Sequence, residues 1–186
     1  MKIFFNLTLA VFVLPLVLPL SGLLAILVVL TSPGPALYWS DRIGRHNRVF
    51  EMPKFRTMRT DTPAVATHLL ESPEQWLTPI GSFLRKSSLD ELPQLWSILK
   101  SDMSFVGPRP ALFNQYDLIE LRTQAGVHKL QPGLTGWAQI NGRDELPITE
   151  KVKLDIEYMR LQSFKFDLYI LWMTFLKVVK RDGVSH

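Results

Sequence analysis

The sequence of 186 residues contains no cysteine, which excludes disulfide bonds and thiolate metal sites. Its four histidines are scattered, with neither His-x-His nor His-Glu-x-x-His spacing, so we do not predict a histidine-based metal or catalytic site. Charged side chains are also missing from a long stretch, because Lys2 is the only one before Asp41. The chain is nevertheless long enough for one domain with a hydrophobic core.

The overall charge is positive. A formal net charge of +4 and a pI of about 9.4 favour anionic partners, such as a membrane surface, a nucleic acid or a phosphorylated substrate. The basic residues are dispersed, however, and a nucleic-acid binder would leave the long uncharged segment near the N-terminus without a purpose. We therefore do not predict nucleic-acid binding; salt-dependent binding of an oligonucleotide would contradict this.

The uncharged segment from Leu7 to Leu30 is largely apolar and exceeds the roughly 20 residues that a helix needs to cross a bilayer. A cleaved signal peptide is disfavoured, because the apolar part is too long for the usual core and no clear Ala-x-Ala site precedes Thr31. A simple membrane-spanning helix remains open.

A helix that enters the membrane and returns on the same face is the third interpretation. Pro15 and Pro19 lie one turn apart near the middle of the segment, and proline inside a helix removes a hydrogen bond and bends the axis. Basic residues on both sides, Lys2 before it and Arg42 after it, suit two cytoplasmic ends. We expect a membrane-embedded helix–break–helix over 1–32 and a cytosolic, membrane-associated domain over 33–186.

The first part of the second region has the pattern of a β-hairpin. We expect a short strand or interfacial segment over Ala36–Trp39, a turn over Asp41–Arg48 and an extended segment over Val49–Met58. The alternation of the last segment places Lys54 and Arg56 on one face, although a solvated strand face would give the same pattern. Residues 59–79 are polar, and we expect a surface excursion there with at most a short helix.

Two adjacent carboxylates mark the centre of the chain. Apolar residues after them recur at helical spacing, and Ser88 with Glu91 fits a capping box. Pro93 favours a helix start nearer Asp90, because proline is tolerated in a first turn. Either start places Asp90 and Glu91 in the first turn, where acidic residues are common simply because the helix dipole favours them.

The neighbouring cations favour a function for this pair. Four basic side chains lie in or beside segments rich in turn and strand signals: Lys54, Arg56, Arg85 and Arg109. A helix N-terminus surrounded by cations is a site for an anion such as phosphate. A carboxylate can approach a phosphate diester only if the repulsion is neutralised, which Mg²⁺ together with Arg and Lys achieves. One carboxylate would then attack phosphorus while the other holds the metal.

The C-terminal half contains further turn and helix signals. We expect a rigid loop at Gly107–Pro110, a helix over Ala111–Gly126 and a hairpin over Leu130–Arg143, whose Pro-Gly and Asn-Gly pairs flank a short strand. Pro147 is placed to start another helix. The aromatic segment at 164–180 suits an interfacial amphipathic helix better than a second span. The predicted class is therefore α+β, mostly helical, with short β-hairpins.

Several of these motifs, in this order, resemble the bacterial sugar transferase family, the monotopic phosphoglycosyl transferases, and by length the chain is similar to the minimal, catalytic-domain-only members. The matching motifs are Ser32–Pro35, Lys54–Met58, Leu89–Leu95, Asp102–Pro110 and Pro132–Arg143. Two parts depart from the family pattern. Leu18-Pro19 stands where the family has a Ser-Pro helix break, and Lys2 to Asn6 is a degraded form of its Lys-Arg-x-Phe-Asp start.

The resemblance implies transfer of a sugar-1-phosphate from a UDP-sugar to polyprenyl phosphate, usually undecaprenyl phosphate, with release of UMP. Asp90 matches the nucleophile of a covalent, ping-pong mechanism, and Glu91 matches its partner; both would bind Mg²⁺. The substrate- or phosphate-binding positions are Lys54, Arg56, Arg85, Arg109, Gln139 and Arg143. The resemblance also places the protein in a bacterial inner membrane, with the catalytic domain on the cytoplasmic face.

Two other functions have to be weighed. A non-catalytic binder of anionic lipid would explain the charge and the apolar helices, but it leaves Asp90, Glu91 and Arg109 unexplained. A glycosidase needs two carboxylates facing each other across a cleft, which adjacent residues at a helix start do not do. We therefore favour the transferase and keep the lipid binder as the alternative.

Overall fold

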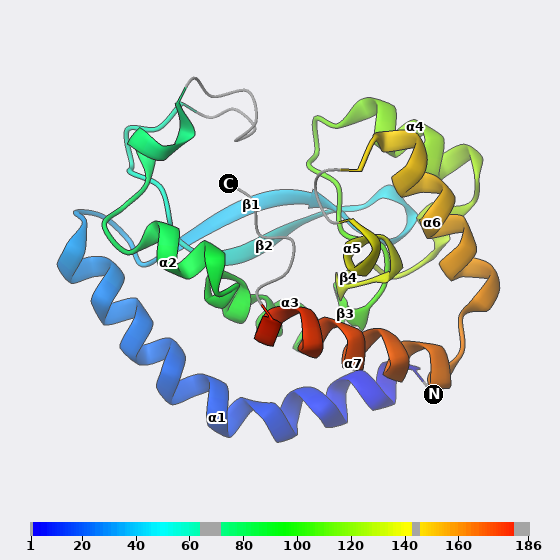
Figure 1. Cartoon of the computed structure of the whole chain (residues 1–186), viewed down its shortest axis with the longest axis horizontal. Coiled ribbons are helices and arrows are strands. Elements are labelled where there is room, and N and C mark those ends of the chain that lie inside the picture. The colour runs from blue at the N-terminus through cyan, green and yellow to red at the C-terminus, as the bar shows by residue number, and fades with distance from the viewer. Residues whose placement is uncertain (1, 64–71, 143–145, 181–186) are drawn as a thin grey trace.

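The computed structural model describes residues 2–63, 72–142 and 146–180, and it combines helices with two small sheets (Figure 1). In chain order the elements are α1 (Lys2–Thr31), β1 (Leu37–Ile43), η1 (Arg45–Asn47), β2 (Val49–Phe55), η3 (Pro73–Trp76), α2 (Gly81–Lys86), η4 (Leu89–Gln94), α3 (Leu95–Leu99), β3 (Ser104–Val106), α4 (Tyr116–Gln124), η5 (Val127–Lys129), β4 (Gly133–Thr135), α5 (Trp137–Asn141), α6 (Ile148–Leu161) and α7 (Phe164–Lys180). The predicted mixture of helices and strands is confirmed.

The first helix, α1, carries Pro15 and Pro19 in its interior and continues through both, so the predicted break does not interrupt it. Instead the helix follows a curved path along one side of the molecule (Figure 1). Among the described residues it is the one helix long and apolar enough to cross a membrane, judged by length and composition. Its buried residues lie toward its two ends: Asn6, Ala10, Leu24 and Val28. Most of the residues between Ala10 and Leu24 are exposed.

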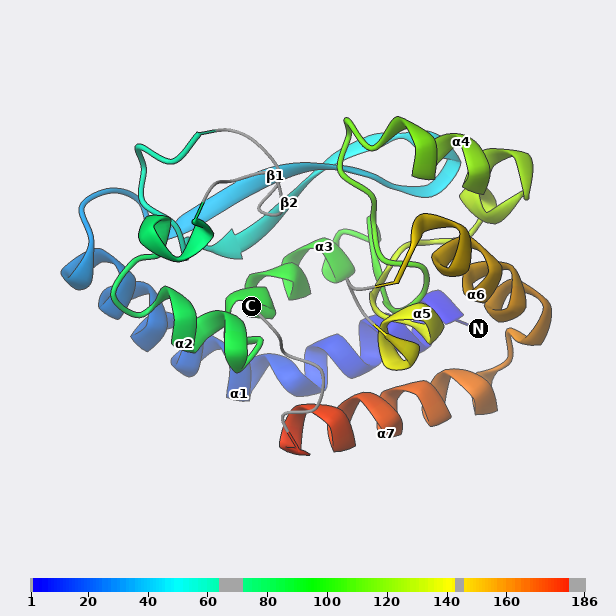
Figure 2. The same cartoon turned by 45° about the horizontal axis from the view of Figure 1, so that its top comes forward.

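Both ends of α1 are fastened to the same body. At the N-terminal end, Lys2 Nζ lies 2.9 Å from Asp167 Oδ2 of α7 and also donates to the Tyr158 hydroxyl of α6. At the other end, Arg56 donates to Ser32 Oγ at 2.9 Å. Figure 2 shows α1 running alongside the rest of the chain from one end to the other. The helix, about 45 Å long, is therefore held to one domain at both of its ends.

The predicted N-terminal hairpin is confirmed, with a first strand longer than expected. β1 and β2 pair antiparallel from Leu37 opposite Phe55 to Ile43 opposite Val49, and residues 44–48 form the turn. Lys54 and Phe55 end β2 next to the segment that carries the two central carboxylates. The hairpin therefore forms the wall behind that segment.

The hairpin predicted over residues 130–143 is wrong. Residues 133–135 form β4, which pairs in parallel with β3, and helix α5 begins at Trp137 instead of a returning strand. Glycines allow this close crossing: a Cβ on Gly133 would lie 2.1 Å from the backbone nitrogen of Gly107. The crossing places the Gly107–Pro110 loop against β4.

Two helix starts also differ from the prediction. The helix expected from Ala111 begins only at Tyr116, because Ala111 accepts a hydrogen bond from the Ile43 N–H and Leu112 bridges to Arg42. The central carboxylates lie in a 3₁₀ helix, η4, not in an α-helix. Ser88 precedes it with a φ of 56° and makes no capping hydrogen bond, so the predicted capping box does not form.

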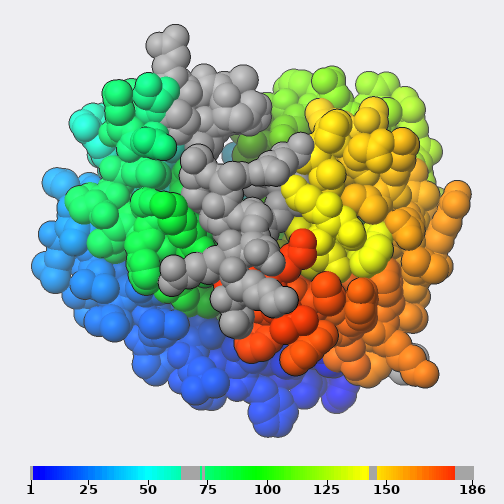
Figure 3. Space-filling model, viewed as in Figure 1, coloured from blue at the N-terminus to red at the C-terminus, as the bar shows by residue number. Residues whose placement is uncertain are grey.

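Apolar surface is concentrated on α1 and α7. The large exposed side chains of α7 include Phe164, Trp172 and Phe175, and the exposed residues of α1 include Phe12 and Leu16. Phe5 and Phe164 meet edge to face at 5.0 Å, so the two helices run together at the N-terminus of α1. Figure 3 shows α1 in blue along one edge of the molecule and α7 in red beside it. An exposed apolar surface of this extent is typical of a membrane- or protein-binding face.

Candidate active site

The two central carboxylates stand where four structural elements meet. Asp90 and Glu91 lie in the first turn of η4, as predicted. Lys54 is the last but one residue of β2, Arg85 belongs to α2, and Arg109 lies in the loop after β3. The fold thus gathers residues spread over more than fifty positions of the chain, because β2 packs beside η4 and the β3–β4 crossing turns the loop toward both.

Glu91 is held by two cations through one oxygen. Its Oε1 accepts from Lys54 Nζ at 2.8 Å and from Arg109 Nη2 at 2.6 Å. Burial alone would raise the pKa of this carboxyl, but the charges and hydrogen bonds of Arg109 and Lys54 outweigh burial and hold the pKa well below its usual range. Glu91 is therefore ionised and fixed in orientation.

Asp90 is in a different environment. The residue is only 8% exposed, and its Oδ2 lies 3.9 Å from Lys54 Nζ, which is longer than a hydrogen bond. Burial raises the pKa of Asp90 to about 6; the Lys54 charge opposes this rise and the neighbouring Glu91 charge adds to it. Asp90 is thus the more basic and the less strongly held of the two carboxylates.

The immediate surroundings favour an anion. Lys54, Arg85 and Arg109 contribute three positive charges, against two negative charges on the carboxylates. Arg85 Nε donates to Thr57 Oγ1 at 3.0 Å, which orients its guanidinium on the wall beside Asp90. Since the cations exceed the carboxylates, a bound phosphate would be attracted even before a metal is considered.

Arg56 does not join this cluster in the structure. Its side chain is buried and donates to Pro35 O at 2.7 Å, Ser32 Oγ at 2.9 Å and Ser32 O at 2.8 Å. The predicted alternation failed here because β2 ends at Phe55, and the chain then turns toward the exit of α1. Arg56 ties that exit in place.

The remaining predicted positions are more distant from the carboxylates in the chain. Gln139 lies on α5, and both atoms of its side-chain amide are buried without a hydrogen-bond partner among the described residues. A Cβ built on Gly136 would lie 2.7 Å from Gln139 Oε1 and 2.1 Å from the carbonyl oxygen of Gly107, so the Gln139 amide and the start of the Arg109 loop both lie against Gly136. Arg143 lies outside the described residues.

The donor set suits Mg²⁺. No group of three or more acidic, histidine or cysteine side chains occurs within the described ranges, so an all-protein metal cage is not formed there. Mg²⁺ commonly takes only one or two carboxylates and completes its shell with water and substrate phosphate oxygens. Asp90 and Glu91 can supply those carboxylates, and the ion pair between Asp90 Oδ2 and Lys54 Nζ is long, at 3.9 Å.

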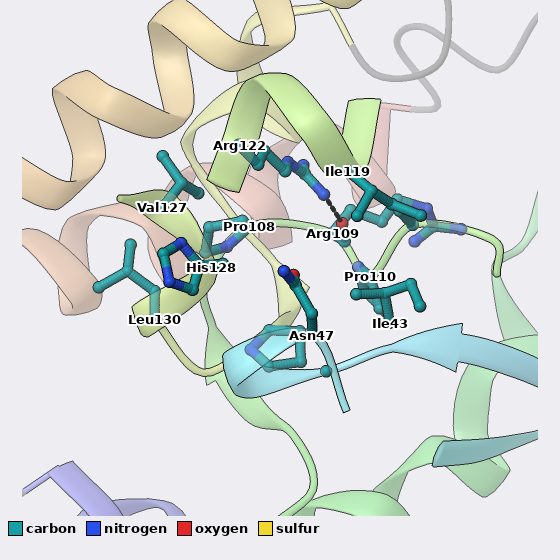
Figure 4. A pocket seen from close by; sticks show the side chains of 13 residues that line it. Ile43, Asn47, Pro108, Arg109, Pro110, Ile119, Arg122, Val127, His128 and Leu130 are labelled. Atoms are coloured by element: carbon teal, nitrogen blue, oxygen red, sulfur yellow. Dashed lines mark hydrogen bonds between the residues drawn. The ribbon is translucent and has the colours of Figure 1, made fainter. Parts of the chain in front are cut away.

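Sequence reasoning missed the residues that hold the Arg109 loop from behind. Arg122 of α4 donates through Nη1 to the Arg109 carbonyl at 2.8 Å, as Figure 4 shows, and Arg42 donates to the next carbonyl, that of Pro110. Arg42 and Arg122 belong to no sequence motif, and only the folding of the chain brings them next to the loop. The cavity beside Arg109 and Arg122 has a volume of about 30 Å³, which suits a few water molecules and is far below the several hundred Å³ typical of a ligand pocket.

The fold and the site define a protein with an anion site of two carboxylates and three cations, built beside a long apolar helix that its own domain holds at both ends. The family model for bacterial sugar transferases matches residues 1–181. The chain belongs to the bacterial sugar transferase family.

Relatives with related names support this assignment. The chain is 41% identical over 185 residues to an uncharacterized sugar transferase, EpsL, of Bacillus subtilis, covering 100% of the chain and 90% of that protein. It is 39% identical to the undecaprenyl-phosphate glucose phosphotransferase of Komagataeibacter xylinus and 40% identical to the UDP-glucose:undecaprenyl-phosphate glucose-1-phosphate transferase of Escherichia coli. These matches cover 97% and 92% of the chain, but the chain spans only 35% and 39% of those longer proteins.

Proposed function

We propose that this protein transfers a sugar-1-phosphate from a UDP-sugar to polyprenyl phosphate, such as undecaprenyl phosphate, and releases UMP. The observation that carries the proposal is the unequal pair of carboxylates: Glu91 is clamped by two cations, while Asp90 beside it is buried, more basic and close to the same cations. The relatives named as undecaprenyl-phosphate sugar phosphotransferases support the same reaction.

Asp90 is assigned the attacking role because its electron pairs are less engaged than those of Glu91. Glu91 Oε1 receives two charge-assisted hydrogen bonds, which lower its basicity and its nucleophilicity. Asp90 Oδ2 has its nearest cation at 3.9 Å, and its higher pKa makes it the stronger nucleophile once it has lost its proton.

The reaction would proceed in two displacements at one phosphorus atom. Asp90 forms a bond to the sugar-bearing phosphorus as the bond to the bridging oxygen breaks, and UMP leaves with that electron pair. An oxygen of polyprenyl phosphate then attacks the same phosphorus, and the bond to Asp90 breaks. The product is a polyprenyl diphosphate sugar and the carboxylate is regenerated, with no net proton transfer. Dividing the transfer in this way is covalent catalysis.

The cations have separate tasks in this scheme. Arg109 and Lys54 fix Glu91, and together with Arg85 they attract and orient the diphosphate of the donor. Asp90 and Glu91 would hold Mg²⁺, which when bound neutralises phosphate charge and polarises the phosphoryl group. Gln139 and Arg143 are proposed as further substrate contacts, on the strength of their place in the 132–143 motif.

The apolar helix explains how a lipid acceptor reaches the site. We infer that α1 enters and leaves the same membrane face, because both of its ends are fastened to one domain. The exposed apolar side chains of α7 would lie in the interface next to it. With a UDP-sugar as donor, we propose that the domain lies on the cytoplasmic face of a bacterial inner membrane, where the phosphate of a polyprenyl lipid lies at headgroup level.

The test is UMP release from a panel of UDP-sugars, in detergent with undecaprenyl phosphate and Mg²⁺, with and without EDTA. We expect UMP only with the lipid, the metal and a matching sugar, and none from Asp90→Asn. Asp90→Asn should also fail to retain radiolabelled sugar phosphate after acid quench. The control Asp61→Asn, which changes a carboxylate that is 57% exposed, should keep the wild-type rate.

Two outcomes would overturn the proposal. Normal turnover by Asp90→Asn would remove the nucleophile assignment. Vesicle binding by folded protein without UMP release from any UDP-sugar would favour the non-catalytic binder of anionic lipid, which the exposed apolar surface also fits.

A further inference from the structure

The loop that presents Arg109 has an unusual means of support. Pro108 and Pro110 flank the arginine and have no N–H group to donate, so the loop cannot be fixed through those two backbone nitrogens. Instead, each carbonyl from Pro108 to Ala111 accepts a hydrogen bond. The donors, in order, are the Gly133 N–H at 2.9 Å, Arg122 Nη1 at 2.8 Å, Arg42 Nη1 at 3.3 Å and the Ile43 N–H at 2.9 Å.

The donor to Arg109 itself is held by a buried carboxylate. Arg122 donates to Asp155 Oδ2 through both Nε at 2.9 Å and Nη2 at 2.7 Å. The Asp155 side chain is 2% exposed and the Arg122 side chain 11% exposed. Because the guanidinium is a rigid plane, fixing two of its nitrogens also fixes the direction of the third, Nη1, which reaches the Arg109 carbonyl.

We propose that Arg122, oriented by Asp155, is a positioning residue for the reaction. It holds the backbone of Arg109 so that the Arg109 guanidinium stays on Glu91. Hydrogen bonds connect α6 to α4 and α4 to the carbonyl of Arg109, and the side chain of the same residue continues the connection to η4, where Arg109 Nη2 lies 2.6 Å from Glu91 Oε1. The inference rests on the proposed function.

The simpler interpretation is that the pair only joins α4 to α6. A buried ion pair of that kind would affect stability when broken, because one charge is left uncompensated. It would not, however, be coupled to Arg109. The third hydrogen bond of the guanidinium separates the two interpretations, because it goes to the loop of the site and not to either helix.

Arg122→Gln should lower kcat/KM for UMP release by roughly 10- to 100-fold, the range typical of a catalytic group displaced by about an ångström. The decisive measurement is a double-mutant cycle with Arg109→Gln. If Arg122 acts through Arg109, then Arg122→Gln should cost almost nothing further in the Arg109→Gln background. Arg122→Lys should not restore the rate, because an ammonium group cannot hold Asp155 and the carbonyl in the same plane.

The matched control is Val152→Ala. Val152 is buried on α6 in the same α4–α6 cluster, with Leu118 and Ala111. This variant should lower the melting temperature, leave kcat/KM near that of wild type, and combine additively with Arg109→Gln. If Arg122→Gln does not fold, Asp155→Asn takes its place in the cycle, because it keeps the size of the side chain and removes its charge.

A second readout does not depend on turnover. The side-chain ¹⁵N–¹H signal of Arg109, assigned by its loss in Arg109→Lys, should shift or broaden in Arg122→Gln and stay in place in Val152→Ala. An unchanged signal, or additive losses in the cycle, would overturn the positioning role. An inactive wild-type protein with the expected change in the Arg109 signal would instead contradict the proposed function and leave the support of the loop established.

Discussion

Asp90 and Glu91 are adjacent in the chain, yet their pKa values move in opposite directions. The cause is the direction of two cations: Lys54 and Arg109 donate to Glu91 and not to Asp90. Asp90 is left buried with its charge incompletely balanced, and its pKa rises to about 6. A buried carboxylate with a strongly shifted pKa is typical of functional sites.

This environment should make Asp90 a source of instability at neutral pH. With an ordinary pKa near 3.8 in the unfolded chain and about 6 in the folded protein, the folded state holds the proton more tightly between these values. The stabilising effect of the proton is complete below about pH 4 and is lost as the pH rises through 6. Above that pH the ionised side chain costs about 3 kcal/mol relative to a neutral one.

Asp90→Asn should therefore melt several degrees above wild type at pH 7.5 in metal-free detergent, and the difference should shrink toward zero at pH 4.5. Scanning fluorimetry across this pH range would measure it. Asp61→Asn, at an exposed position, should show no comparable pH-dependent gain. Equal or lower melting of Asp90→Asn at pH 7.5 would show that Asp90 is not strained by its surroundings.

Single residues could be predicted from the sequence where local patterns decide their place. The first-turn position of Asp90 and Glu91 was predictable, because an apolar face and Pro93 restrict where the helix starts. Arg56 was misplaced, because the alternation of a strand says nothing about where that strand ends. Arg122 and Asp155 were missed, since a buried pair separated by 33 positions has no local signal.

At the scale of elements, the N-terminal hairpin and the parallel β3–β4 pair show what sequence patterns can specify. A charged, glycine-containing turn joins two neighbouring strands, so the β1–β2 hairpin was predictable. The Pro-Gly and Asn-Gly pairs around β4 gave the same local signal, but the partner strand lies about thirty residues earlier in the chain. The close approach of Gly107 and Gly133 decides that pairing, and periodicity does not reveal it.

Gly133→Ala should disrupt this crossing. The added Cβ would lie 2.1 Å from Gly107 N and 2.4 Å from Thr135 O, both backbone atoms that cannot rotate away. We expect a loss of stability of about 1–3 kcal/mol, measured by thermal or denaturant unfolding, and a lower rate of UMP release because the Arg109 loop shifts.

Gly22→Ala is the matched control for this substitution. A Cβ at Gly22 meets nothing within 4 Å, and the residue lies inside α1, where alanine is the better helix former. This variant should be as stable as wild type or slightly more stable. If both alanine variants behaved alike, the glycine contact would not be what holds the crossing.

At the scale of the whole molecule, the path of α1 follows from its two anchors. The Lys2–Asp167 ion pair and the Arg56–Ser32 hydrogen bonds hold its ends on one domain. Pro15 and Pro19 did not decide between a membrane-spanning and a re-entrant helix, because they predict a bend but not whether the two ends of the helix lie on the same side of the membrane. The anchors were not predictable, since each joins residues from distant parts of the chain.

Topology can be tested with little background, because the chain has no cysteine of its own. We expect single cysteines at Ile3 and Thr31, both exposed near opposite ends of α1, to react with a membrane-impermeant maleimide from the same side of sealed vesicles. Both should be labelled in inside-out vesicles and neither in intact spheroplasts. Labelling from opposite sides would mean that the helix spans the bilayer.

The contacts of Lys2 with Tyr158 and Asp167 also have a consequence for the synthesis of the protein. Lys2 and its partner Tyr158 are 156 positions apart, so this contact can form only after all the residues between them have been synthesised. At about 5–20 residues per second, the N-terminus waits roughly 10–30 s before Tyr158 and Asp167 have been synthesised. During that interval α1 is tied to the domain by its C-terminal anchor alone. Its N-terminal end is therefore fixed only once α6 and α7 have been synthesised and have docked against it.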